Sequence, residues 1–420
     1  MTSLAQTSAA TGSPRINRER LLARIAELAA VGAIEGGGVA RLALTDADRE
    51  GRDLVVRWMK ELGLAVTVDA IGNVVGVRAG REVGPPVMTG SHIDTVRTGG
   101  RYDGNLGVLA GLEVVAALND ANAVTRRPIA VAFFTNEEGA RFQPDMMGSL
   151  VYQGDLSLET ALDTVGIDGT TVRENLERIG YAGPAPVGSN SVHAFVELHV
   201  EQGPLLEHEG IAIGAVTGVQ GIHWTEFTLE GVSNHAGTTP MALRHDAGLV
   251  AAEIAAFARR VAREAGSGQL ATVGHISLTP NLVNVIPNRA VFTLDLRNTD
   301  ASALTAAVQR VFDFAETAAQ AEGVKLSRRS LADFAPVALD DRIVSRVEAL
   351  AREHGHSVRR MPSGAGHDAQ ILARMCPTGM IFVPSVAGLS HNVKEFTHDA
   401  DIEAGANLLF ALMCELANEP

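Results

Sequence analysis

The chain has 420 residues, of which 46% are hydrophobic and 20% charged, and its 49 acidic residues against 35 basic ones give a net charge of −14. We expect a globular protein of two or three domains, without affinity for nucleic acid or for an anionic membrane. No apolar run approaches the roughly 18 residues of a membrane span. The two cysteines, Cys376 and Cys414, cannot build a disulfide framework, which favours a cytoplasmic location.

Residues 1–15 are rich in Ser, Thr, Ala and Gly and lack the apolar stretch of a signal peptide, so we expect a disordered tail. After this tail, helical and extended patterns of apolar residues alternate, as in an α/β domain. Helices are expected over 16–31, 45–62 and 106–118, and strands over 66–69, 73–77 and 85–89.

Polar side chains directly follow the predicted strand at 85–89, in the segment GSHIDTVRTGGRYDGNLG (90–107). The segment contains His92, Asp94 and Asp103, and its glycines permit tight turns that could bring Asp103 back towards His92. The carboxyl end of a strand is where open α/β sheets bind ligands. We therefore expect a ligand site here, although ordinary polar loop residues are an alternative reading of this segment alone.

Other predicted strands end in the same residue types. Glu137 and Glu138 follow PIAVAFFT (128–135), HAFVELHV (193–200) contains His199, and His391 follows a later strand. A lone histidine is more often a satisfied core residue than a ligand, but four strand ends that carry imidazoles and carboxylates argue against that reading. Without a thiolate, this set suits Zn²⁺, Mn²⁺ or Co²⁺, and it is large enough for two ions bridged by one carboxylate.

After Val216 the pattern changes to the β-α-β-β-α-β order of a ferredoxin-like α+β domain. Strands are expected near 225–229, 271–278, 290–297 and 325–331, and helices over 246–265 and 301–321. The α/β pattern then resumes. We therefore expect a second domain at 219–333, inserted into a discontinuous metal-binding domain formed by 16–218 and 334–420.

Eight motifs, GSHIDT, RYDGNLG, NEEGARF, ELHVEQGP, SNHAGTTPM, NVIPNRAVFTLDLR, SGAGHDA and GLSHN, resemble in that order the hydantoinase/carbamoylase family of binuclear metal amidohydrolases. The family is related to the aminoacylases and the co-catalytic zinc carboxypeptidases. The resemblance implies an aminopeptidase-like catalytic domain, an inserted ferredoxin-like lid and dimerisation domain, and two divalent metal ions per subunit (Zn, Mn or Co). It also implies a homodimer with shared active sites.

The resemblance further implies a role for each residue at the strand ends. His92 and His199 would hold one metal ion, Glu138 and His391 the other, and Asp103 would bridge them. Glu137 would be the general base, since neighbouring side chains on an extended segment point in opposite directions. Asp94 is expected to accept the second ring N–H of His92 and so fix its tautomer.

The inserted domain would supply groups for the substrate. His235 would polarise the scissile carbonyl, and Asn284 and Arg297, with Gln202, would bind a carboxylate, while the Gly366 loop would close one wall. In relatives the histidine, asparagine and arginine of this domain serve the neighbouring subunit. Without the resemblance, a surface salt bridge would be favoured for Arg297, and a turn histidine would be equally plausible for His235.

The expected reaction is hydrolysis of the ureido C–N bond of an N-carbamoyl-L-amino acid to the amino acid, ammonia and CO₂. The alternatives are β-ureidopropionase and allantoate amidohydrolase; against the second, Ile222 stands where allantoate-type relatives carry a polar residue. A dipeptidase or aminoacylase and a non-catalytic metal-dependent binding protein are further alternatives. The presence of Glu137 argues against a binding protein, because a binding protein needs ligands but no base.

Overall fold

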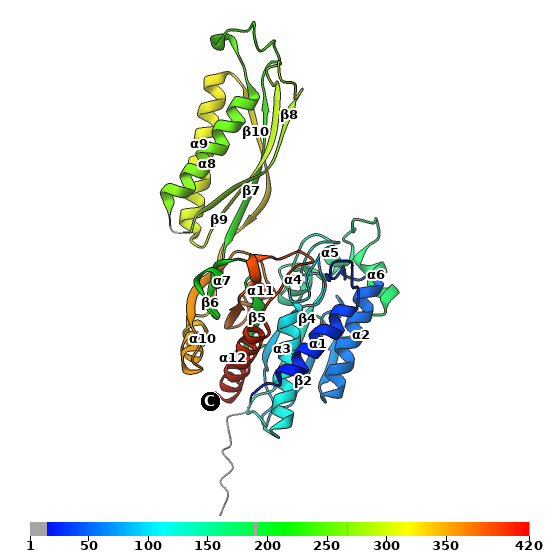
Figure 1. Cartoon of the computed structure of the whole chain (residues 1–420). Helices are drawn as coiled ribbons and strands as arrows, with labels where there is room; N and C mark the ends of the chain where they lie inside the picture. Colours follow the sequence, from blue (N-terminus) through cyan, green and yellow to red (C-terminus); the bar gives the residue numbers. More distant parts are fainter. Residues whose placement is uncertain (1–14, 189–190, 267, 420) are drawn as a thin grey trace, which may run out of the picture. The chain divides into compact units, whose positions relative to one another are not determined.

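The computed structural model describes residues 15–188, 191–266 and 268–419; residues 1–14 of the expected tail lie outside this part. The chain divides into two compact units (Figure 1). The second unit comprises Gly218–Ala338 and Pro362–Gly364, and the first comprises the residues before Gly218 together with Leu339–Met361 and the residues from Ala365 onwards. The expected fold class, an α/β unit interrupted by an α+β insertion, is confirmed.

A mixed sheet forms the centre of the first unit, with the strand order β1-β2-β4-β3-β5-β13-β6 and with β12 paired to β6. β3, β4, β5 and β13 run parallel. Every residue of these four strands is buried, as expected for strands covered on both faces. The strands are β1 Ala65–Val68, β2 Val74–Arg78, β3 Val87–His92, β4 Ile129–Phe134, β5 Ala194–Val200, β6 Ile213–Val219, β12 Val358–Ser363 and β13 Thr378–Val383.

Helices cover this sheet, and one of them determines the position of the loop that follows β3. α3 (Asn105–Asp120) contacts β3 and β5 on one side and α1 and α12 on the other, so that it is buried over nearly its whole length. The other helices of the unit are α1 Arg18–Ala30, α2 Asp46–Glu61, α4 Met147–Gln153, α5 Leu158–Leu162, α6 Val172–Ile179, α7 Leu205–Glu209, α10 Asp341–Glu353, α11 Asp368–Leu372 and α12 Asp399–Asn418.

The second unit is a four-stranded antiparallel sheet in the order β10-β7-β9-β8, with α8 (Ala247–Ala265) and α9 (Ala301–Glu322) packed together on one face (Figure 1). Its strands are β7 Gly221–Glu230, β8 Leu270–Thr279, β9 Arg289–Asn298 and β10 Lys325–Phe334. The short strand β11 (Val337–Ala338) pairs with Gly218 and Val219. Alternate residues of the strands, such as Phe227 on β7 and Phe292 and Leu294 on β9, form the core of the second unit.

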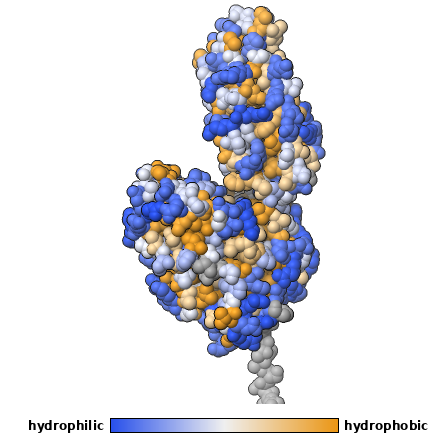
Figure 2. Space-filling view, turned by 180° about the vertical axis from the view of Figure 1, so that it is seen from behind, coloured by the Kyte–Doolittle hydropathy of each residue, from blue (hydrophilic) through white to orange (hydrophobic). Residues whose placement is uncertain are grey.

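On the face that Figure 2 shows, hydrophilic and apolar side chains are mixed on each of the two units. Large apolar residues are exposed on the two edge strands of the second unit, namely Leu270 and Ile276 on β8 and Leu331 and Phe334 on β10. No helix in the described part of the chain combines the length and the apolarity that a membrane crossing requires.

Candidate active site

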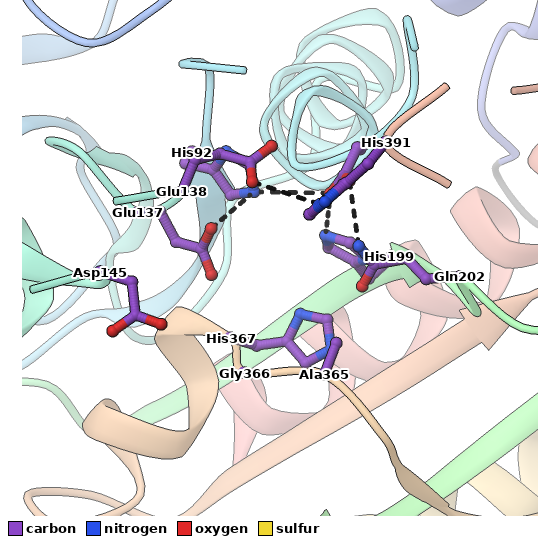
Figure 3. A pocket seen from close by; sticks show the side chains of 11 residues that line it. His92, Glu137, Glu138, Asp145, His199, Gln202, Ala365, Gly366, His367 and His391 are labelled. Carbon is purple, nitrogen blue, oxygen red and sulfur yellow. Dashed lines mark hydrogen bonds and ion pairs between the residues drawn. The ribbon is translucent and has the colours of Figure 1, made fainter. Parts of the chain in front are cut away.

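The polar residues at the strand ends of the first unit converge on one small cavity of about 120 Å³ (Figure 3). His92 is the last residue of β3, Glu137 and Glu138 follow β4, and His199 is the second-last residue of β5. The parallel strands bring these residues together because their carboxyl ends lie at one edge of the sheet. The cavity is lined by His92, Asp103, Glu137, Glu138, Asp145, His199, Gln202, Ala365, Gly366, His367 and His391.

Asp103 lies at the centre of two groups that could each hold a metal ion. Its Oδ1 is 3.3 Å from His199 Nε2 and 3.7 Å from His92 Nε2. Its Oδ2 is 3.4 Å from His391 Nε2, which in turn is 3.3 Å from Glu138 Oε2. One carboxylate oxygen thus faces each group. The donor set of imidazole nitrogens and carboxylate oxygens fits divalent Zn, Mn or Co.

The histidine rings of the first group are held so that Nε2 faces this centre. His92 Nδ1 lies 2.9 Å from the carbonyl oxygen of Asp94, and His199 Nδ1 lies 2.9 Å from that of Val200. A carbonyl oxygen can only accept, so both Nδ1 atoms carry the proton and both Nε2 atoms face the centre with a lone pair. The lone pair of His199 Nε2 accepts a hydrogen bond of 3.1 Å from the backbone N–H of Gly104, which a metal ion would have to displace. Gly104 permits the close approach, because a Cβ at this position would lie 2.4 Å from the His92 ring.

The expected contact between the Asp94 carboxylate and His92 was wrong, since the backbone carbonyl of Asp94 makes that contact. The two carboxylate oxygens of Asp94 instead accept hydrogen bonds of 3.3 Å from the backbone N–H groups of Glu137 and Glu138. The chain turns after β3, so the carbonyl faces the ring and the side chain faces the end of β4. Asp94 therefore positions both glutamates.

Glu137 and Glu138 are both largely buried beside Asp103. Glu138 contacts His391, whereas Glu137 Oε2 lies 3.4 Å from His92 Nε2 and lines the cavity. Burial, together with the neighbouring carboxylate of Asp103, raises the pKa of Glu138 to about 8. Burial also raises the pKa of Glu137. Burial acts in the same direction on Asp103, but hydrogen bonds with His199, His391 and His92 hold its pKa well below the usual range.

Two buried charged side chains, Arg41 and Glu395, hold the loop between β3 and α3 in place, and neither was expected from the sequence. The buried guanidinium of Arg41 donates 2.7 and 2.8 Å hydrogen bonds to the Ile93 carbonyl and to Asn105 Oδ1. The buried Glu395 accepts from the backbone N–H groups of Tyr102 and Asp103 at 3.0 and 3.1 Å. Arg41 thus holds both ends of the loop, and Glu395 holds the backbone of Asp103.

Gln202 does not offer the amide donors that were expected for a substrate carboxylate. Its Nε2 donates to Asp103 Oδ2 at 3.0 Å and to Ser390 Oγ at 3.1 Å. Its Oε1 is buried and accepts no hydrogen bond within the described part of the chain. The left-handed backbone of Gln202, with φ of 58°, directs the side chain towards Asp103. Gln202 therefore presents an acceptor, which repels a carboxylate.

Gly366 lines the cavity as expected, but two other lining residues, His367 and Asp145, were missed. The buried His367 ring lies 4.5 Å from that of His199, centroid to centroid, and burial holds its pKa well below the usual range. The signal for His367 is its place in the SGAGHD motif, directly after Gly366. The signal for Asp145 is a single acid in the otherwise non-polar PDMMG segment that follows NEEG.

In the second unit, His235 and Asn284 lie side by side and are both exposed. The Ala236 N–H donates to the Asn284 carbonyl at 2.9 Å, and His235 forms a β-bridge with Val285. The backbone N–H groups of Gly237 and Thr238 donate to His235 Nδ1 at 3.0 and 3.2 Å. Because Nδ1 accepts, the proton of the neutral ring is on Nε2, which is free to donate to a carbonyl.

Arg297 lies at the other end of the same sheet. In the β7–β9 register, Arg289 is opposite Glu230 and Arg297 is opposite Ile222. Asn284 precedes Arg289 and His235 follows Glu230, so about 26 Å of strand, at roughly 3.3 Å per residue, separates them from Arg297. The expectation that one inserted domain delivers His235, Asn284 and Arg297 to the same site was therefore wrong, because a small substrate cannot span that distance.

Arg297 also has a local partner. Its Nε and Nη2 donate to Asp295 at 2.9 to 3.1 Å, and its Nη1 donates to the Gly364 carbonyl at 2.8 Å. The ion pair is one quarter exposed. Asp295 thus occupies one edge of the guanidinium and orients it, and the outward N–H groups of the two Nη atoms remain available for a carboxylate.

Residues 88–415 match the peptidase family M20/M25/M40. The chain is 42% identical to the N-carbamoyl-L-amino-acid amidohydrolase of Rhizobium meliloti, over 96% of this chain and 97% of that protein. It is 35% identical to the ureidoglycolate hydrolase of Arabidopsis thaliana, over 94% of this chain and 85% of that protein. The crystal structure of a hydantoinase/carbamoylase family amidase from Burkholderia multivorans superposes with a TM-score of 0.95 at 45% identity, covering 97% of this chain and all of that one.

Proposed function

Because the chain belongs to the peptidase family M20/M25/M40, and within it to the hydantoinase/carbamoylase amidohydrolases, we propose that it hydrolyses N-carbamoyl-L-amino acids. The products are the L-amino acid, ammonia and CO₂. The observation that carries this proposal is the position of Glu137, a buried carboxylate beside two groups of potential ligands that share Asp103. A binding protein would need the ligands alone.

His92, Asp103 and His199 would hold one divalent ion, and Asp103, Glu138 and His391 the other. When bound, such ions supply electrophilic assistance at a carbonyl oxygen and make water easier to deprotonate. Zn²⁺, Mn²⁺ and Co²⁺ all fit these ligands. Glu137 takes the proton of the attacking water and delivers it to the leaving nitrogen. Asp94 keeps Glu137 in place for both transfers through its contact with the backbone.

The substrate carboxylate is bound by Arg297, whose outward N–H groups are free, and the ureido carbonyl is polarised by the Nε2–H of His235. Ile222 lies directly opposite Arg297 in the sheet, so an apolar side chain next to the carboxylate has a matching neighbour. This combination suits an α-carboxylate that carries an apolar L side chain. A β-ureido acid would place one more carbon between the two anchors and lose alignment at the reacting centre.

The separation of His235 from Arg297 supports a homodimer with shared sites. Arg297 holds the Gly364 carbonyl, two residues before Gly366, which lines the cavity. We therefore assign Arg297 to the site of its own chain, and His235 and Asn284 to the site of the partner subunit. The exposed apolar residues on β8 and β10 are available for such an association. A cytoplasmic location agrees with the two free thiols.

The proposal is tested by ammonia release from purified protein supplied with Mn²⁺, Zn²⁺ or Co²⁺ in turn. We expect kcat/KM for N-carbamoyl-L-methionine to exceed that for N-carbamoyl-β-alanine, allantoate, ureidoglycolate and dipeptides, with the D-enantiomer inert. A higher value for β-alanine or allantoate would assign the chain to β-ureidopropionase or allantoate amidohydrolase. Cleavage of peptides or N-acetyl amino acids would indicate a dipeptidase or aminoacylase. Binding without any turnover would indicate a metal-dependent binding protein.

A further inference from the structure

Asp145 is an acidic residue in the cavity to which the proposed reaction assigns no role. Its side chain lines the same cavity as Glu137, and the two lie on the opposite side from Gln202 and His391 (Figure 3). Within the described part of the chain, no side chain pairs with the Asp145 carboxylate, and the only donor that it meets is its own backbone N–H. Burial raises its pKa. A partly buried carboxylate without a partner is costly unless a ligand supplies hydrogen-bond donors.

The segment that carries Asp145 is held firmly. The backbone N–H of Met146 donates to the Glu137 carbonyl at 2.7 Å, and Asn136 Nδ2 donates to the Pro144 carbonyl at 3.2 Å. A Cβ on Gly139 would come within 2.9 Å of the Asp145 backbone, so the loop packs closely on itself. Asp145 is therefore fixed relative to Glu137 before any substrate binds, as a group that reads a substrate must be.

Gln202 Oε1 is a second acceptor on the cavity wall without a partner in the described chain. Its orientation is set by the two hydrogen bonds that the other amide atom donates to Asp103 and Ser390. These two acceptors, the Asp145 carboxylate and Gln202 Oε1, lie on opposite walls of the cavity. They would be satisfied by a ligand that donates hydrogen bonds on both of its sides. A ureido group, with one N–H and one NH₂, does so, whereas an N-formyl or N-acetyl amide has a single N–H.

We propose that Asp145, opposite the Oε1 of Gln202, is a specificity residue that accepts the N–H groups of the substrate's ureido moiety and so selects carbamoyl over formyl and acetyl derivatives. This inference rests on the proposed function. Asp145 forms and breaks no covalent bond during the reaction. It acts only by binding the substrate. A site built to accept a substrate N–H discriminates against an analogue that lacks it, because the buried acceptor is then left unpaired.

The test compares N-carbamoyl-L-methionine with N-formyl-L-methionine in metal-loaded wild-type protein and in Asp145→Asn and Asp145→Ala. We expect kcat/KM for the carbamoyl substrate to fall about 10- to 100-fold, as for loss of a hydrogen bond to a charged group, and that for the formyl substrate to change less than about threefold. The control is Glu50→Gln, a substitution of an exposed glutamate that does not line the cavity. It should change neither value of kcat/KM. Equal losses on both substrates, or no loss on either, would overturn the proposal.

A binding measurement separates this proposal from the proposed function. Calorimetry with Glu137→Gln, which should bind without turnover, gives the Kd of both compounds with and without Asp145→Asn. We expect the second substitution to weaken binding of the carbamoyl compound at least tenfold more than that of the formyl compound. If wild-type protein hydrolyses neither compound but this ratio holds, the proposed reaction fails and the role of Asp145 stands. If hydrolysis occurs and the ratio is near one, the reverse applies.

Discussion

Asp94 receives the backbone N–H of Glu137 on one carboxylate oxygen at 3.3 Å, and the N–H of the next residue on the other. Asp94→Asn replaces one of these acceptors by an NH₂ group that faces a donor. We expect kcat to fall about 10- to 100-fold, since small misplacements of a base are costly, while metal content stays at the wild-type level. Metal analysis of the same preparation checks this. Loss of metal with unchanged turnover per loaded site would mean that Asp94 serves the ligands and not the base.

Glu137 and Glu138 are adjacent but have different proposed roles. Glu137→Gln should keep its metal content and lose roughly 10² to 10⁴ in kcat, the usual contribution of a general base. Glu138→Gln should lose metal from the group that contains His391. Metal content by mass spectrometry and ammonia release, measured on both variants, distinguish the roles. The roles of the two glutamates would be exchanged if Glu137→Gln lost metal while Glu138→Gln kept its metal and was inactive.

Mixed dimers test which chain supplies each group from the second unit. Glu137→Gln and His235→Ala should each be inactive alone. Mixed together, they should regain up to about one quarter of wild-type activity by random exchange, because one site of the hybrid has an intact Glu137 and receives an intact His235.

The matched mixture of Glu137→Gln with Arg297→Ala should regain nothing, since each site then lacks either its own base or its own arginine. Native mass spectrometry confirms that the subunits exchange. Recovery in the arginine mixture, with none in the histidine mixture, would reverse the assignment of the two residues.

Arg41 is fully buried and donates to four acceptors, including the Leu28 and Val31 carbonyls near the end of α1. Burial lowers its pKa to about 10, so it stays charged at neutral pH. Arg41→Met leaves these acceptors unpaired, and we expect unfolding free energy to fall by about 3 kcal/mol or more, at about 1–3 kcal/mol per orphaned group. Denaturant unfolding measures this loss, with the exposed Arg49→Met as control. If the two variants lost the same unfolding free energy, the hydrogen bonds of Arg41 would not stabilise the loop of the site.

The two thiols should be unreactive at neutral pH. Burial raises the pKa of Cys414 to about 11 and also raises that of Cys376. At pH 8 about one Cys414 side chain in a thousand is then a thiolate, so alkylation by iodoacetamide should quicken about tenfold per pH unit from pH 7 to 10. In denaturant the rate should level off near pH 9, the range of an unperturbed thiol. A native rate that is already level at pH 9 would contradict the raised pKa.

The sequence predicted the centre of the site well because strand ends are visible as changes from apolar runs to polar residues. His92, Asp103, Glu138, His199 and His391 were all found in this way, and the structure brings all five together. The orientation of side chains was not predictable. Whether the carbonyl or the carboxylate of Asp94 faces His92, and whether Gln202 presents its NH₂ or its oxygen, depends on backbone angles that the sequence does not display.

The distance of Arg297 from His235 and Asn284 along the sheet of the second unit could not be predicted from the sequence either. The resemblance grouped His235, Asn284 and Arg297 by their motifs, and motifs carry no register. The register places Arg297 opposite Ile222, at the far end from Asn284. Arg41 and Glu395 were missed for a related reason, since a buried charged residue is recognised by its partners. The loop residues that Arg41 holds, Ile93 and Asn105, are 52 and 64 positions away in the chain, and those that Glu395 holds are more than 290 positions away.

The position of β13 determines when this site can assemble during synthesis. β13 lies between β5 and β6 and pairs with both, although it begins 178 residues after the end of β5 and 159 residues after the end of β6. Until residues 378–383 leave the ribosome, β5 and β6 each present an open edge to other chains. From the end of β6 until β13 is made, the nascent protein therefore holds an incomplete sheet, and the group of potential ligands that contains His391 cannot form. Chaperone demand should be concentrated in that interval.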